Sequence, residues 1–90
     1  MILNQKKYEI IKNEKEGFDK EEVESLLTDY FDSYDYILGD WAYGKLRLKG
    51  FYKSDNKNKK VYNDYEGIDK YIKDKCAFGC KHFILKKIEK

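Results

Sequence analysis

The sequence predicts an α+β fold: a two-layer sandwich in which a mainly antiparallel sheet packs against two helices, in the order β-α-β-β-(β)-α-β. Three observations support this prediction. Apolar and charged residues alternate with a period of two in several short segments, apolar residues recur at helical spacing in two others, and the chain contains no proline. The length of 90 residues is that of a single domain covering residues 1–90.

The composition indicates a folded protein of the cytoplasm. Hydrophobic residues make up 41% of the chain and aromatic residues 17%, an apolar content that disordered segments lack. No apolar run approaches the ~20 residues of a membrane span, and no signal-peptide pattern opens the chain. The two cysteines are too few for a secreted disulfide scaffold of this size. We therefore expect a cytoplasmic location and no membrane contact.

Charge is distributed unevenly along the chain. The net charge is +2, but residues 1–33 carry −4, residues 34–60 carry +4 and residues 61–90 carry +2. The net charge alone would predict no particular partner. The asymmetry is more informative, because separated charges of opposite sign favour charged partners.

The first two elements are predicted from apolar spacing and capping. A strand is expected at residues 8–12, where apolar side chains lie among charges. A helix is expected over residues 19–32, because Asp19 is a favourable N-cap and Glu22 follows three residues later. Its apolar stripe consists of Val23, Leu26, Leu27, Tyr30 and Phe31, and its other face is acidic.

A hairpin is predicted in the middle of the chain. Strands are expected at residues 34–41 and 45–53, joined by a glycine-bearing turn within 39–44. The second strand alternates, so that one face carries Leu46, Leu48, Gly50 and Tyr52 and the other carries Lys45, Arg47, Lys49 and Phe51. The polar segment 54–60 is expected to be a loop, followed by a short strand at 61–62.

The last two elements are a helix and a strand. The helix is expected within residues 65–76, with Gly79 placed to form its left-handed C-terminal cap. Its apolar side carries Ile68, Tyr71, Ile72 and Cys76. The final strand is expected at residues 82–88, where apolar and charged side chains again alternate.

The segment Tyr34–Tyr52, taken together with Cys76–Cys80 and Phe83–Leu85, resembles the YutD-like family. The first of these segments is a nearly continuous nineteen-residue motif, and the resemblance covers most of the chain. It implies kinship with small cytoplasmic proteins of low-GC Gram-positive bacteria and mollicutes. Because the family is functionally uncharacterised, the resemblance implies no catalytic residue and no cofactor.

The strand face formed by Lys45, Arg47 and Lys49 is the candidate binding surface. Cations two residues apart on a strand are ~7 Å from each other, close to the phosphate spacing of a nucleic-acid strand. Aromatic side chains for stacking on unpaired bases would come from Tyr36, Trp41, Tyr43 and Phe51. The pattern predicts a non-enzymatic module that contacts RNA or a ribonucleoprotein.

Two other interpretations fit the same residues. The cationic face is also typical of an ordinary solvated sheet surface, on which the aliphatic parts of lysine and arginine cover apolar area. A protein–protein adaptor would instead use the hairpin aromatics together with the acidic helix at 19–32. Exposure of the three cations to solvent is the condition on which the RNA interpretation depends.

Cys76 and Cys80 form the remaining candidate site. A thiol-redox pair or a metal site with His82 is one interpretation, although three residues between the cysteines depart from the usual Cys-x-x-Cys spacing. Two reduced cysteines packed as small hydrophobic residues at a helix end are the other interpretation. No resident metal is predicted, and we expect His82 to be an exposed strand residue and Asp40 to stabilise a turn.

Overall fold

A computed structural model describes residues 1–75 and 81–88. Its five strands form one antiparallel sheet with the spatial order β1-β2-β5-β3-β4. The strands are β1 (Ile2–Leu3), β2 (Lys6–Glu14), β3 (Tyr36–Ala42), β4 (Lys45–Phe51) and β5 (His82–Lys87). The helices are α1 (Lys20–Leu26) and α2 (Ile68–Lys75), with 3₁₀ turns at Asp29–Phe31, Val61–Asn63 and Tyr65–Gly67. The predicted α+β class, with a mainly antiparallel sheet and two helices, is confirmed.

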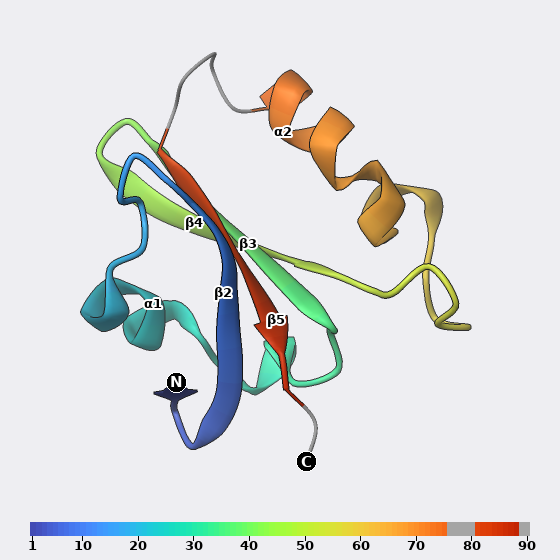
Figure 1. Cartoon of the computed structure of the whole chain (residues 1–90), viewed down its shortest axis with the longest axis horizontal. Helices are drawn as coiled ribbons and strands as arrows, with labels where there is room; N and C mark the ends of the chain where they lie inside the picture. Colours follow the sequence, from blue (N-terminus) through green and yellow to red (C-terminus); the bar gives the residue numbers. More distant parts are fainter. Residues whose placement is uncertain (76–80, 89–90) are drawn as a thin grey trace.

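The two helices lie on opposite faces of the sheet (Figure 1). This layering differs from the expected two-layer sandwich, which places a single helical layer on one side. The physical reason is the sequence of the central strands. Ile37 and Leu38 in β3, and the run Phe83–Leu85 in β5, are consecutive apolar residues that point to alternate faces, and all are buried. Both faces of the sheet are therefore apolar, and each has to pack against another layer.

The core on the α1 side is the larger of the two. It joins Val23 and Leu27 to the 3₁₀ residue Phe31 and to one face of the sheet. The sheet contributes the buried residues Tyr8, Ile37, Leu46, Phe83 and Leu85, and β1 contributes Leu3. Close approach of aromatic rings is possible here because two strand positions lack a side chain: the Phe83 ring covers Gly39, and the Tyr34 ring covers Gly50.

The core on the α2 side consists of Leu38, Phe51, Ile68 and Ile84. Tyr36, Tyr65, Tyr71 and Ile72 pack around it. This face of the sheet is the one that carries the three cations of β4, because Phe51 shares their alternation. The second helix thus covers part of the surface that the sequence proposes as a binding face.

Helix α1 begins as predicted and ends earlier. The Asp19 side chain accepts a hydrogen bond from the Glu22 backbone N–H at 3.2 Å, which confirms the N-cap. The helix stops at Leu26, because the amide of Asn4 in the β1–β2 turn donates to the carbonyl oxygens of Glu24 (3.0 Å) and Leu27 (2.8 Å). These bonds satisfy C-terminal carbonyls that a longer helix would have used.

Four local predictions need correction. Residues 61–62 lie in a 3₁₀ turn rather than a strand, and the hairpin turn occupies only residues 43–44. Asp40 is a buried strand residue, not a turn residue, and His82 is buried although it was expected to be exposed. Both corrections follow from strand order: β3 and β5 are interior strands, so Asp40 and His82 each have a neighbouring strand on both sides. Neither α1 nor α2, nor any other helical segment of the described residues, is long and apolar enough to cross a membrane.

Candidate functional site

The β3–β4 hairpin ends in a two-residue turn formed by Tyr43 and Gly44. Both residues have positive φ, +56° and +76°, as the two central positions of a tight hairpin turn require. Glycine adopts this conformation at no steric cost, whereas a bulky aromatic residue does so rarely. The Tyr43 side chain is nevertheless fully exposed (104% of its reference value). The turn therefore presents a bare phenol ring to solvent on a strained backbone.

Arg47 in β4 is committed to an ion pair with Asp40, its cross-strand neighbour in β3. Its Nε donates to Asp40 Oδ1 at 3.2 Å and its Nη2 donates to Asp40 Oδ2 at 2.7 Å, a two-pronged contact. The hydrogen bond to Asp40 raises the pKa of the Arg47 guanidinium. The Asp40 side chain is almost completely buried, while about half of Arg47 remains exposed. The Asp40 carboxylate thus already neutralises Arg47, the middle of the three cations on this strand face.

Lys49 lies among aromatic rings. Its Nζ is 5.3 Å from the ring centre of Phe51, 5.3 Å from that of Tyr71 and 5.5 Å from that of Tyr62. Contacts of this kind are typical cation–π interactions. The Phe51 ring is itself buried and meets Tyr71 of α2 edge-on at 5.6 Å. Burial raises the pKa of the Tyr71 phenol, so this ring stays neutral beside the ammonium group at ordinary pH.

The stacking residues expected from the sequence do not share one surface. Tyr36 faces the α2 side, where its ring stacks on Tyr65 at 3.8 Å. Trp41 faces the α1 side: its Nε1 donates to the carbonyl oxygen of Gly17 at 2.7 Å, and the Nζ of Lys81 lies 5.0 Å from its ring centre. Of the four predicted aromatic residues, Phe51 and Tyr36 serve the α2-side core, Trp41 serves the α1-side core, and Tyr43 alone is bare.

Two carboxylates hold the loop after β4. Asp35 accepts from the backbone N–H of Lys53 at 2.8 Å and from the side-chain amide of Asn56 at 3.1 Å. Asp64 accepts from the hydroxyl of Ser54 at 2.7 Å and from the backbone N–H of Glu66 at 3.0 Å, and it pairs with Lys59 at 3.2 Å. These bonds, the one from Ser54 foremost, lower the pKa of Asp64. Tyr52 and Asp64 are also joined by a parallel backbone bridge. The lysines of this loop therefore sit on an anchored segment.

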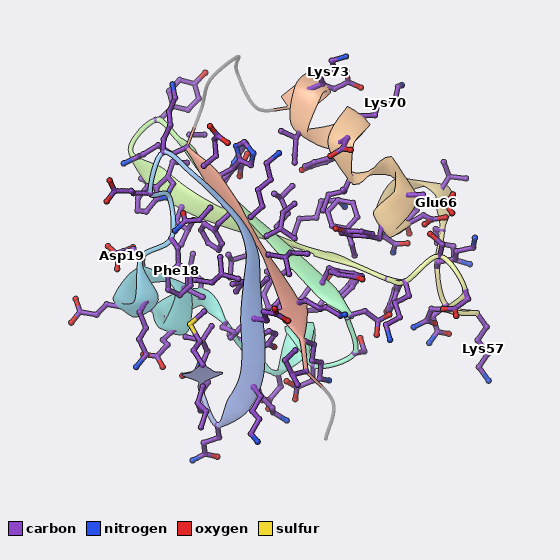
Figure 2. All side chains as sticks on the ribbon, viewed as in Figure 1. Phe18, Asp19, Lys57, Glu66, Lys70 and Lys73 are labelled. Atoms are coloured by element: carbon purple, nitrogen blue, oxygen red, sulfur yellow. The ribbon has the colours of Figure 1, made fainter. Side chains whose placement is uncertain are left out.

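Charge is segregated between the two sides of the molecule. Residues 14–32, around α1, contain eight acidic and two basic side chains, whereas residues 45–75, around α2, contain ten basic and five acidic ones. In Figure 2, Asp19 lies at α1 on one side, while Lys57, Lys70 and Lys73 project outward on the other. The uneven charge seen along the sequence is thus also uneven in space.

The structure brings together only part of the predicted site. Lys45 and Arg47 are exposed at the hairpin and Lys49 is half-buried. Cys76 and Cys80, with Gly79, lie outside the described residues, so the thiol and metal interpretations stay predictions. The Arg47–Asp40 pair was missed by sequence reasoning. A two-residue turn at 43–44 would have identified it, because that turn fixes Asp40 opposite Arg47.

A family model described as "YutD-like: Putative antitoxin YutD-like" matches residues 2–86. The chain belongs to the YutD-like family. It is 39% identical over 90 residues, covering 100% of this chain and 99% of the relative, to the protein described as "Putative antitoxin YutD" from Bacillus subtilis (strain 168). The solution NMR structure of protein yutD from B. subtilis superimposes with a TM-score of 0.82 at 43% identity, covering 100% of this chain and 83% of that one. The family resemblance stated from the sequence is confirmed.

Proposed function

We propose that this YutD-like chain is a non-enzymatic binding module whose partner is a protein, and that it acts as an antitoxin in the cytoplasm by binding that protein through the β3–β4 hairpin. The description of the B. subtilis relative as an antitoxin supports a protein partner. The single observation that carries the proposal is Tyr43, an exposed aromatic side chain held at positive φ.

Tyr43 fits a binding role better than a folding role. In the described residues its side chain makes no hydrogen bond and no ring stacking contact, so it adds little to the core. The left-handed conformation costs roughly 1–2 kcal/mol for a residue with a Cβ. Strain of this kind is characteristic of functional sites, and tyrosine is enriched where proteins bind one another.

RNA binding through Lys45, Arg47 and Lys49 is the weaker candidate. It requires three solvent-facing cations and nearby stacking surfaces. Arg47 is paired with Asp40, Lys49 lies among three rings, and Trp41 belongs to the opposite face of the sheet. The exposed lysines of residues 53–60 still make RNA a useful comparison in the experiment.

The test compares capture by the wild-type chain and by Tyr43→Asn, immobilised and exposed to a B. subtilis lysate with and without nuclease. Asparagine tolerates positive φ, so this variant removes the ring and keeps the turn. We expect a protein that is retained after nuclease treatment and lost, by tenfold or more, on Tyr43→Asn. Val61→Asn, which removes another fully exposed apolar side chain, is the matched control and should retain the protein.

The same variant has a stability consequence. Because the strain at Tyr43 is relieved without loss of core packing, we expect Tyr43→Asn to raise the free energy of unfolding by about 1 kcal/mol, measured by denaturant titration. Equal capture by wild type and Tyr43→Asn would count against the hairpin as the site. If the captured material is lost on nuclease treatment, the partner is RNA and not a protein.

A further inference from the structure

Strand β4 has an unpaired edge. It is an outer strand of the sheet, and among the described strands it pairs with β3 alone. The register pairs Ala42 with Lys45 across the tight turn, so the backbone groups of residues 45, 47, 49 and 51 point toward β3. Those of Leu46, Leu48 and Gly50 point away from it. Within residues 1–75 and 81–88, no hydrogen bond is made to these outward groups.

Just beyond β4, residues 63–65 of the same chain already pair with this edge. The backbone N–H of Tyr52 donates to the carbonyl oxygen of Asn63 at 2.7 Å, and the N–H of Tyr65 donates to the carbonyl oxygen of Tyr52 at 2.9 Å. The edge is thus closed at residue 52, and Gly50 is buried. The open stretch therefore runs from Leu46 to Leu48. At ~3.3 Å per residue the open stretch accommodates a short extended segment of a partner.

A second copy of this chain is a poor occupant. Antiparallel pairing of two β4 edges centred on Arg47 would place arginine opposite arginine and Lys45 opposite Lys49. Like charges directly opposite one another destabilise a strand pair, and cations on an edge strand are a common protection against self-association. The occupant must therefore bring the opposite charge.

We propose that the open edge of β4 binds an extended segment of the protein partner that alternates acidic and apolar residues, adding it to the sheet as a sixth, antiparallel strand. Acidic side chains would lie opposite Lys45, Arg47 and Lys49 on the α2 face. Apolar side chains would lie opposite Leu46 and Leu48 on the α1 face. Main-chain hydrogen bonds supply affinity in this mode, and the alternate side chains supply specificity.

The charges on the α2 face suit this occupant. Lys45 is exposed, and Arg47 uses two of its five N–H donors on Asp40 while about half of its side chain stays accessible. The exposed ring of Tyr43 lies at the end of the same edge, where it would pack against the incoming segment. This inference rests on the proposed function and specifies the chemistry of the partner.

The experiment uses the full chain and a synthetic heptapeptide, N-acetylated and C-amidated, of sequence Thr-Glu-Val-Glu-Val-Glu-Thr. We expect millimolar or tighter binding, seen by NMR as shifts confined to residues 43–50 and as at least tenfold slower exchange of the Leu46 and Leu48 amide protons. Replacing the three glutamates by lysines should abolish binding. Lys45→Glu should weaken binding of the acidic peptide by about fivefold, the size of an exposed ion pair.

Two methylated peptides provide the decisive control. In antiparallel pairing the valines lie opposite Leu46 and Leu48, so their N–H groups point at β4, and N-methylation of both valines should abolish binding. N-methylation of the glutamates leaves the groups facing β4 intact and should preserve it. Equal behaviour of the two methylated peptides, or no binding of the parent peptide at several millimolar, would overturn the edge site. A nuclease-resistant, Tyr43-dependent capture would still stand in that case, so the two proposals fail separately.

Discussion

At the scale of single residues, two glycines determine the packing of the core as much as the residues with side chains do. A Cβ built at Gly39 would lie 2.1 Å from the Phe83 ring, and one at Gly50 would lie 2.2 Å from the Tyr34 ring. Both distances are far below contact distance, and neither ring is at the end of a flexible side chain. These glycines allow aromatic rings to lie flat on the sheet, which explains why glycine occurs inside strands that it would otherwise weaken.

We expect Gly39→Ala to lower the free energy of unfolding by about 1–3 kcal/mol, the usual cost of overpacking a core. Gly67→Ala is the matched control, since a Cβ at Gly67 would meet nothing within 4 Å, and its effect should stay within about 0.5 kcal/mol. Denaturant unfolding monitored by tryptophan fluorescence measures both. Similar losses for the two variants would show that ring packing over Gly39 is not the cause.

Several of these residues could be predicted from the sequence and others could not. The N-cap at Asp19 and the buried positions Val23, Leu27 and Phe31 follow from local spacing, and the structure confirms them. Leu26 and Tyr30, which belong to the same predicted stripe, are exposed, because the helix ends at Leu26. The burial of His82 did not follow, because it depends on β5 lying between β2 and β3. That placement is a contact between distant parts of the chain, and local periodicity carries no information about it.

At the scale of elements, the division of the two helices between the two faces decides which predicted site residues remain accessible. Helix α2 and the 3₁₀ turn before it bring Tyr65, Tyr71 and Ile68 onto the face that carries the β4 cations. The sequence predicts Ile68, Tyr71 and Ile72 of the apolar stripe of this helix correctly, and Cys76 lies outside the described residues. The sequence does not say which face of the sheet the stripe covers, since each face of β3 offers a comparable apolar surface.

The stability that the segment between β4 and α2 gives to the folded state should depend on pH. The lowered pKa of Asp64 means that its ionised form stabilises the folded state. This stabilisation is fully present above the unfolded-state pKa of about 3.9 and is lost as the pH falls through the lower folded-state value. We therefore expect Asp64→Ala to lower Tm at pH 7 and to lower it much less at pH 2.5, as measured by thermal unfolding across that range.

The control for this prediction is Asp55→Ala, an exposed carboxylate of the same loop. It should change Tm little at either pH. A Tm difference for Asp64→Ala that stays constant from pH 7 to pH 2.5 would assign the effect to lost packing instead of lost charge.

At the scale of the whole molecule, the sheet is assembled from the two ends of the sequence. The last strand, β5, pairs with β2 on one side and with β3 on the other, so that Tyr8 lies opposite Lys87 and Tyr36 lies opposite Lys86. Without β5 the N-terminal strands and the central hairpin have no common neighbour. Such non-local pairing makes folding slow relative to helical proteins of the same size.

A chain that stops at Lys81 should therefore not fold cooperatively. Both cores lose buried members of β5, namely Phe83, Ile84 and Leu85. We expect poorly dispersed amide resonances and a broad thermal transition with no defined midpoint, compared with the sharp transition of the full chain. A truncated chain that retained a sharp transition would show that the β3–β4 hairpin and the helices suffice on their own.

The separation of acidic α1 from the basic side around α2 gives the molecule a permanent electric dipole moment. In the electric field of a partner with the complementary charge distribution, the protein is oriented before contact. Productive collisions then become more frequent than random tumbling would allow. The rate of complex formation, more than its lifetime, should then fall as salt shortens the range of that field. A small protein can thereby find its target quickly even when the contact surface is no larger than one turn and one strand edge.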